Sequence, residues 1–464
     1  MFSGIIRYFY PDLKKEELNK FGHLAVAFFF TVGTYWLLRL VKDAVVYKLA
    51  FPTELGWQIG YGALVVKYLK TASPFMVAIA LAIYTKLVDM YEKQQLFYII
   101  GSFFSVIFAF IGITLFGADM LGYEAIGAIP GATLALGATG ALGYLVTEIF
   151  GSLMMALFWS FTVSSTTSDQ AKRGFPFVIA LGQIGAIIGS SLMIVKGSFP
   201  TWPLYFVAIA TILGLIFTIK SLVASIPKAE LSGGKEEKKS KPDFFAGVKL
   251  LIAQPYLMGV FVVSTFYEVA KVVVDIQMKY QASVIPDFDF PRFLGIFGIC
   301  VNSLSFVMVL LGTSYAMKKY GLRVCLLIYP IVFGFCLTGM YFYYLNGPTP
   351  ENLLWATFAA MMIITATSYA VNNPVKEMMY IPTSKDAKFK AKGLVDMIGG
   401  RGGKMAGANI GGSLITPGNL PLTVASLMTT GTLISLGIVG VWAIVAVYVG
   451  IKNAQLVRDG EIIE

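Results

Sequence analysis

The sequence has little charge and little cysteine. Only 13% of its 464 residues are charged, whereas about a quarter are charged in soluble proteins. With 57% hydrophobic residues and a mean hydropathy of +0.73, this shortage excludes an ordinary soluble domain and indicates a membrane protein. The three cysteines, Cys300, Cys325 and Cys336, lie in or beside apolar segments without metal-ligand spacing. They indicate small packing residues and exclude a disulfide framework.

Two functional signals are also missing. The run GGRGGK at 399–404 is similar to a phosphate loop, but that motif would require glycine at Ile398 and Ser or Thr at Met405. ATP hydrolysis is therefore not predicted, and we expect neither an enzyme nor a bound cofactor or metal. The N-terminus carries Asp12, Glu16 and Glu17 ahead of the first span and has no small-residue cleavage site, so no secretory signal or transit peptide is predicted.

About twelve apolar segments are long enough to cross ~30 Å of hydrocarbon, which takes about 20 residues each. Because lipid satisfies no backbone hydrogen bonds, all of them are expected to be α-helices. The Gly- and Ala-rich stretch at 117–140 is compatible with either an external loop or a helix extension. The predicted span centres are Phe29, Ala78, Ile107, Met154, Ile184, Ala210, Val262, Val307, Val332, Met362, Gly407 and Ser435.

The net charge of +10 is distributed unevenly. Lys and Arg gather in every second loop, which by the positive-inside rule predicts that both termini and the long central loop are cytoplasmic. A bacterial inner membrane is the expected location, and nucleic acid is not an expected partner. The basic loops contain Lys86, Lys93, Lys172, Arg173, the run 228–241, Lys318, Lys319, Arg323 and the run 385–392.

Short repeats predict two six-helix halves. TSDQAK at 167–172 recurs as TSKDAK at 383–388, and GSSLMI from Gly189 recurs as GGSLI from Gly411. A polar, low-complexity stretch separates the halves and reads as a flexible linker. We therefore predict halves at 1–226 and 246–464, a linker at 227–245, and a ligand site near the midplane between the halves.

Four charges are candidates for this site in the first half. Arg39 and Lys42 share one helical face, but both could instead snorkel to the headgroups, as could Lys70. Glu148 stands within an apolar run, where a carboxylate costs ~2.5–3.5 kcal/mol unless it faces a cavity or a cation. Its alternative is a protonated glutamate held by hydrogen bonds inside the bundle.

The second half supplies five more candidates. Glu268 and Lys271 repeat the three-residue spacing of the first span, and an ion pair with a structural role alone is the alternative. Asn372 stands where Pro374 interrupts the tenth span, and such a break frees backbone groups for a ligand. In the eleventh span, Arg401 and Lys404 lie among glycines. Because the charges of both halves are mainly cationic, a cavity that they line would attract a polyanion.

A family resemblance emerges from these same motifs. KEMMYIP, the basic loop after it and KGLVDMIGGRGGKMAGA resemble the signature of the nucleotide transporter family, the ATP:ADP antiporters of plastids and obligate intracellular bacteria. LLRLVKDAVV, YLKTASPFM and TEIFGS also resemble that family's early spans. The similarity runs from about Phe21 to the last span. It implies a major-facilitator-like plan of twelve helices and the exchange of ATP for ADP, with or without phosphate.

The resemblance also implies roles for particular residues. The four charges that the family uses for adenylate exchange fall on Lys70, Glu148, Glu268 and Lys404. We therefore expect alternating access by a monomer in the bilayer, with lysines gripping the phosphates and glutamates competing for the lysines. A proton-coupled importer of nucleotides, NAD or another organic anion stays open as an alternative, and so does a membrane scaffold without transport.

Overall fold

The structure is a computed structural model that describes residues 13–195, 200–226, 244–309 and 314–463. Over these ranges it is helical, apart from turns and one isolated bridge between Thr383 and Ile463. The predicted all-α membrane fold is confirmed. The predicted linker at 227–245 lies outside the described residues except for its last two positions.

Each predicted span centre falls within a helix. Eleven helical segments of the described chain are long and apolar enough to cross a membrane. The twelfth predicted segment follows a continuous path through α15 (Lys385–Leu394), a π-helical turn η6 (Val395–Gly400) and α16 (Arg401–Ser413). Its charges and glycines make it less apolar than the other eleven.

The chain divides into two compact units. Unit 1 comprises the described residues within 1–56, 75–239 and 289–299, and unit 2 comprises those within 57–74, 240–288 and 300–464. Two helices contribute to both units: α3 (Tyr61–Met90), which changes unit after Pro74, and α11 (Phe290–Met308). The predicted division into sequence halves at 1–226 and 246–464 stays a prediction.

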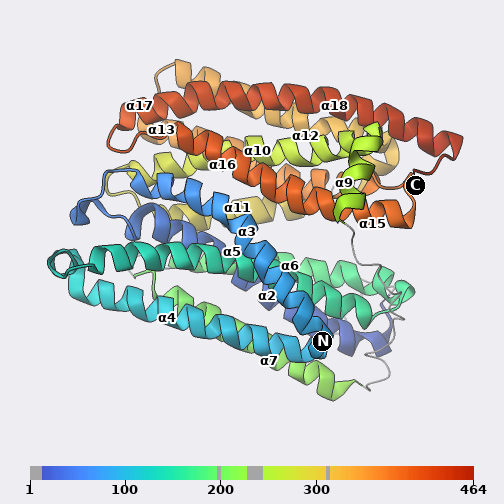
Figure 1. Cartoon of the computed structure of the whole chain (residues 1–464), viewed down its shortest axis with the longest axis horizontal. Coiled ribbons are helices and arrows are strands. Elements are labelled where there is room, and N and C mark those ends of the chain that lie inside the picture. The colour runs from blue at the N-terminus through green and yellow to red at the C-terminus, as the bar shows by residue number, and fades with distance from the viewer. Residues whose placement is uncertain (1–12, 196–199, 227–243, 310–313, 464) are drawn as a thin grey trace. The chain divides into compact units, whose positions relative to one another are not determined.

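Long helices make up unit 1, where α2 packs against α5, α6 and α7, and α4 lies beside α5 and α7 (Figure 1). A side chain at Gly185 or Gly189 of α6 would collide with the α2 backbone at Phe29 or Gly33, so these glycines allow the two helices to approach closely. The stretch at 117–140 extends two helices. Besides its parts of α3 and α11, unit 1 contains η1 (Lys15–Glu17), α2 (Leu18–Ala44), η2 (Val45–Leu49), η3 (Thr53–Leu55), α4 (Lys93–Ala128), α5 (Ala132–Ser164), α6 (Ser168–Val195) and α7 (Pro203–Ser225).

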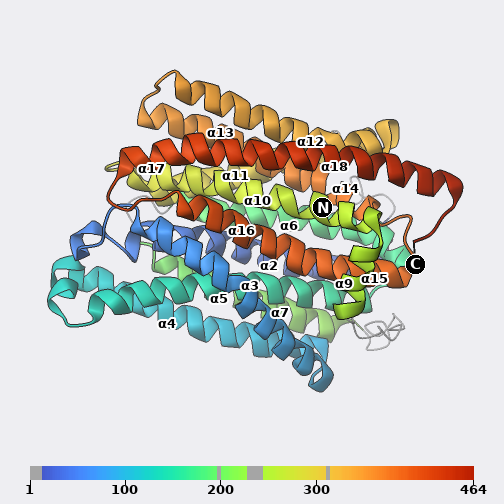
Figure 2. The same cartoon turned by 45° about the horizontal axis from the view of Figure 1, so that its top comes forward.

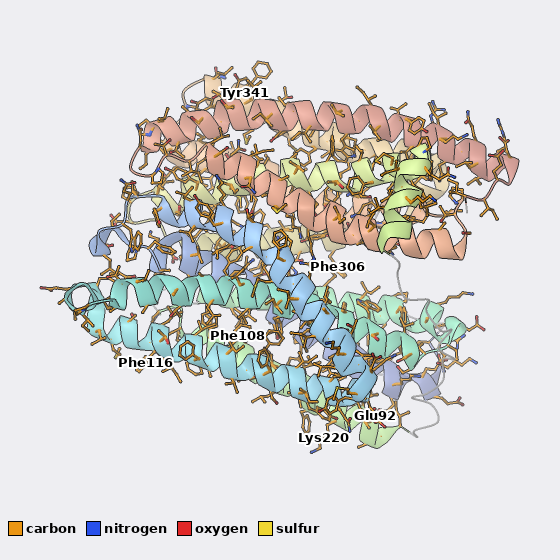
Figure 3. All side chains as sticks on the ribbon, in the orientation of Figure 1. Glu92, Phe108, Phe116, Lys220, Phe306 and Tyr341 are labelled. Carbon is orange, nitrogen blue, oxygen red and sulfur yellow. The ribbon has the colours of Figure 1, made fainter. Side chains whose placement is uncertain are left out.

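Aromatic rings fill the interface between α4 and α5. Phe108, labelled in Figure 3, is fully buried, and its ring centroid lies 5.7 Å from that of Phe150 and 6.1 Å from that of Phe104. Offset and edge-on pairs at such distances are the favourable ones for aromatic rings. This packing holds α5, which carries Glu148, against its neighbours.

In unit 2, α10 is the central helix and is buried along most of its length, with α13, α16 and α18 packed against it. Figure 2 shows α12 and α13 side by side. The predicted interruption at 372–374 takes the form of the π-helical turn η5, which ends two residues before Pro374, a residue that has no N–H to donate. Besides its parts of α3 and α11 and the segment from α15 to α16, unit 2 contains α9 (Phe244–Ala253), α10 (Pro255–Val284), α12 (Ser314–Leu345), α13 (Pro350–Thr367), η5 (Ser368–Asn372), α14 (Asn373–Met378), α17 (Leu420–Ser426), η7 (Leu427–Gly431) and α18 (Thr432–Asp459).

Candidate substrate site

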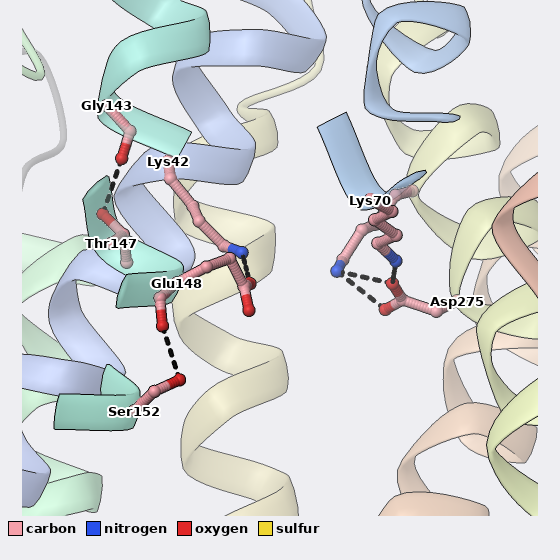
Figure 4. Close-up of polar contacts among 8 residues, drawn as sticks. Lys42, Lys70, Gly143, Thr147, Glu148, Ser152 and Asp275 are labelled. Atoms are coloured by element: carbon pink, nitrogen blue, oxygen red, sulfur yellow. Dashed lines mark hydrogen bonds and ion pairs between the residues drawn. The ribbon is translucent and has the colours of Figure 1, made fainter. Parts of the chain in front are cut away.

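A buried ion pair joins α2 to α5 in unit 1. The Lys42 ammonium pairs with the Glu148 carboxylate (Figure 4) and lies 3.8 Å from the centroid of the Tyr144 ring. Tyr144 and Glu148 are four residues apart, so one face of α5 presents both to the same lysine. Lys42 is only 4% exposed, while Glu148 is 26% exposed. The Glu148 side chain is therefore partly accessible, and the Lys42 side chain is largely enclosed.

Arg39 lies one turn before Lys42 on the same face of α2. It is half-buried, and its guanidinium lies 4.8 Å from the centroid of the Trp36 ring, within the range of a cation–π contact. Unit 1 thus presents two cations on one face of α2, and the second of them, Lys42, pairs with Glu148 of α5.

Unit 2 has a chain of hydrogen bonds that ends on Glu268. The Lys376 ammonium donates to the Tyr267 hydroxyl at 2.9 Å, and that hydroxyl donates to the Glu268 carboxylate at 2.8 Å. The Lys271 ammonium lies 3.8 Å from the other oxygen of the same carboxylate. Lys271, Lys404 and Lys376 all act electrostatically on this single negative charge. Three lysines are therefore gathered around this carboxylate.

Glycine brings Lys404 to this cluster. A side chain at Gly403 would lie 2.9 Å from the Thr265 carbonyl oxygen and 3.2 Å from Cβ of Glu268. Only a residue without Cβ lets α16 approach α10 this closely. The side chain of Lys404 is exposed, and Arg401 lies one turn before it.

The π-helical turn η5 adds polar groups near Lys271. The ring centroid of Tyr369 lies 5.7 Å from the Lys271 ammonium. The amide nitrogen of Asn372, which is 3% exposed, has no hydrogen-bond partner among the described residues. One oxygen of Glu268 likewise accepts no hydrogen bond within the described ranges. Buried polar atoms of this kind need a partner, and a polar ligand would supply one.

Lys70 belongs to a second cluster of unit 2. Its ammonium lies 3.1 Å from the carboxylate of Asp275, and Lys279 lies 2.7 Å and 2.8 Å from the two oxygens of the same carboxylate (Figure 4). Next to Lys70, the Thr71 hydroxyl accepts a hydrogen bond of 2.9 Å from the Asn409 amide. This bond fastens the N-terminal part of α3 to α16.

The structure shows partners for several of the predicted charges. Glu148 pairs with Lys42, Lys271 lies near Glu268, and Lys70 contacts Asp275, while the competition of the two glutamates for the phosphate-binding lysines stays a prediction. Three partners were missing from the predicted site: Asp275, Lys279 and Lys376. The i, i+4 spacing of Asp275 and Lys279 was the one local signal of such a cluster. Of the predicted residues, unit 1 holds Arg39, Lys42 and Glu148, and unit 2 holds Lys70, Glu268, Lys271, Asn372, Arg401 and Lys404.

An all-helical chain with many membrane spans and charge enclosed between the spans has the form of a membrane transporter. The solved structures that it resembles share this fold: a bacterial homologue of the iron transporter ferroportin (TM-score 0.66, 12% identity, 93% of this chain and 99% of that one) and the nucleoside transporter NupG (TM-score 0.57, 12% identity, 91% and 98%). At this identity the similarity concerns the fold alone.

The family follows from the sequence comparison. The model of the TLC ATP/ADP transporter family matches residues 1–452, and the chain belongs to that family. It is 26% identical to ADP,ATP carrier protein 1 of Chlamydia pneumoniae, over 96% of this chain and 93% of the relative. It is 28% identical to the chloroplastic ADP,ATP carrier protein 2 of Arabidopsis thaliana, over 92% and 73%. The protein is therefore a membrane transporter of a nucleotide-carrying family and not an enzyme.

Proposed function

We propose that the protein exchanges ATP for ADP, with or without phosphate, by alternating access. The observation that carries this proposal is the gathering of lysines around two carboxylates of unit 2. Three lysines act on the carboxylate of Glu268, and two contact the carboxylate of Asp275. Enclosed charge within a membrane marks a substrate pathway, and clustered cations suit the phosphates of a nucleotide. The relatives named as ADP,ATP carriers support the same substrates.

The proposed mechanism assigns the phosphates to Lys70 and Lys404, with Lys271, Lys42 and the arginines as helpers. In the substrate-free protein the carboxylates hold these cations in place. An entering nucleotide replaces the carboxylates as the partner of the lysines, so the ion pairs that stabilise the empty state are exchanged for contacts to substrate. We place the protein in a bacterial inner membrane as a monomer, with both termini cytoplasmic.

Uptake of labelled ATP into proteoliposomes tests the substrate and the coupling together. The vesicles are preloaded with ADP, ADP plus phosphate, GDP, NAD or nothing. We expect internal ADP to accelerate uptake and an uncoupler to have no effect. Uptake that does not depend on internal ADP and is abolished by the uncoupler would refute exchange and support proton-coupled import. No uptake under any condition would refute transport of these substrates.

The variant Lys404→Ala tests the site within this assay. We expect ATP exchange to be lost while the abundance of the protein in the membrane is unchanged, because Lys404 is exposed on α16 and its removal leaves no cavity. Lys86→Gln, at an exposed position near the end of α3, is the matched control and keeps full exchange. Normal uptake by Lys404→Ala would refute its role.

A further inference from the structure

A cavity of about 180 Å³ lies in unit 1, where η2 and α4 end and where α5 and α7 begin. Leu49, Leu115 and Leu136 from η2, α4 and α5 form its apolar wall. Among the described residues that line it, Asp119 alone carries charge. Because a cavity of about 150 Å³ holds a molecule as large as benzene, this one has room for a small organic group.

Gly122 bends α4 at this cavity. Its φ of 73° and ψ of 159° are not helical, and a positive φ of this size favours glycine. The bend lies between Asp119 and Tyr123, and both of these residues line the cavity. The Tyr123 hydroxyl donates to the carbonyl oxygen of Leu49 at 3.5 Å, so the phenol ring is tied to the end of η2.

The charge at this cavity is negative. The indole N–H of Trp202 donates to the Asp119 carboxylate at 3.3 Å. The carboxylates of Glu54 and Asp119 both act electrostatically on Tyr123. No lysine or arginine within the described ranges forms an ion pair with either carboxylate. The cavity therefore attracts a cation and repels a nucleotide, so it differs in ligand chemistry from the lysine clusters of unit 2.

Two aromatic rings and a buried hydroxyl line the same cavity. The rings are those of Tyr123 and Trp202. Phe116, labelled in Figure 3, packs edge-on against Trp202 with ring centroids 4.7 Å apart, which holds the indole in place. Thr201 lines the cavity and is only 4% exposed, and its hydroxyl has no hydrogen-bond partner among the described residues. Because a buried hydroxyl needs a partner, this one points to a ligand with a polar atom.

We propose that this cavity binds an organic cation with a quaternary ammonium group, of which choline is the simplest example. The Asp119 carboxylate balances its charge, and the rings of Tyr123 and Trp202 attract its N-methyl groups by cation–π interaction. A quaternary ammonium has no N–H to satisfy, which suits a cavity lined by leucines. The oxygen that follows the ammonium group in choline bonds to the Thr201 hydroxyl. The ligand is the free cation or the same group in a lipid headgroup.

This inference goes beyond the proposed function, and a binding measurement tests it without any transport. The purified full-length protein, in an uncharged detergent and at constant ionic strength, is titrated with choline. A second titration uses the uncharged analogue of choline, in which a tert-butyl group replaces trimethylammonium. The rise of the melting temperature gives the midpoint of each titration. We expect the midpoint for choline to be about tenfold lower than that for the analogue.

Three variants test the parts of the site. Asp119→Asn is expected to raise the choline midpoint about threefold and to leave that of the uncharged analogue unchanged. Tyr123→Leu is expected to raise the choline midpoint about fivefold, whereas Tyr123→Phe, which keeps the ring, retains binding. Glu124→Gln is the matched control, because Glu124 is exposed and is the next residue of α4 but does not line the cavity.

Equal stabilisation by choline and by its uncharged analogue would overturn the proposal, because the cavity would then accept any apolar group of this size. An equal effect of Asp119→Asn and Glu124→Gln would also overturn it, since it would reduce the role of Asp119 to net charge. If Asp119→Asn does not fold, Tyr123→Leu and Tyr123→Phe decide the question, and equal midpoints for these two contradict the cation–π contact.

A third titration, with a short-chain phosphatidylcholine, separates the two sources of the ligand. A lower midpoint for this lipid than for choline, with the same dependence on Asp119, supports the site and assigns it to a lipid headgroup. A higher midpoint for the lipid supports the site and assigns it to the free cation, because the lipid phosphate is repelled by the carboxylates of Asp119 and Glu54. No stabilisation by choline or by the lipid would refute the site.

Discussion

The ion pair of unit 1 allows a stability prediction that separates folding from transport. Glu148→Leu leaves the ammonium of Lys42 enclosed at 4% exposure without its carboxylate. Breaking a buried pair costs about 3–5 kcal/mol. The lower end applies because Glu148 is 26% exposed. The face of the Tyr144 ring, 3.8 Å from the ammonium, stays in place and offsets about 1 kcal/mol. The expected loss of unfolding free energy is therefore about 2 kcal/mol.

For a unit of this size, such a loss lowers the melting temperature by about 4–8 °C. The double variant Lys42→Met/Glu148→Leu removes both charges. Its free energy of unfolding is expected to lie within about 1 kcal/mol of that of the wild type, since apolar residues replace buried ion pairs well. Melting in detergent is compared with ATP uptake for the wild type, both single variants and the double variant. Recovery of stability without recovery of transport is the expected result. A double variant that melts as low as Glu148→Leu would refute the coupling of the two residues.

Two further predictions concern contacts away from this pair. Gly403→Ala is expected to cost about 1–3 kcal/mol of stability and to reduce transport, because its Cβ would lie 2.9 Å from the Thr265 carbonyl oxygen. Gly402→Ala is the control and is expected to be tolerated, because the nearest atom to its Cβ would lie 3.9 Å away. Arg173 donates to Glu17 at 2.5 Å and 3.2 Å and holds the pKa of Glu17 below its ordinary value of 4.5. A lowered pKa means that the pair stabilises the protein above pH 4.5 and that this contribution is lost as the pH falls through the lowered pKa. Melting curves of wild type and Arg173→Gln should thus differ at pH 7 and converge as the pH falls well below 4.5; a constant difference would contradict the assignment.

The sequence was sufficient to predict the helices but insufficient to predict the pairing of their charges. Apolar length locates a span, because the cost of exposing backbone to lipid does not depend on neighbouring helices. The segment around Gly407 was found by sequence despite its charges, since glycines and small residues also mark packed membrane helices. Local pattern therefore decides which segments are spans.

Pairing depends on which faces of distant helices meet. Lys42 and Glu148 are 106 residues apart, and Lys70 and Asp275 are 205 apart. No local spacing encodes such contacts. The face of α5 that carries Glu148 is turned to Lys42 of α2, and Lys70 of α3 contacts Asp275 of α10. The identity of the charged residues could be anticipated, while their counterions required the packing.

The division of α3 at Pro74 has a mechanical consequence. The residues before Pro74 belong to unit 2 and those after it belong to unit 1, so a displacement between the units would bend, twist or stretch α3, as it would α11, which also contributes to both units. Proline has no N–H to bond the carbonyl four residues earlier, and that carbonyl is the one of Lys70. The main-chain hydrogen bond that α3 lacks is therefore the one at Lys70, which contacts Asp275. A bend of α3 at this point would change the contact between Lys70 and Asp275.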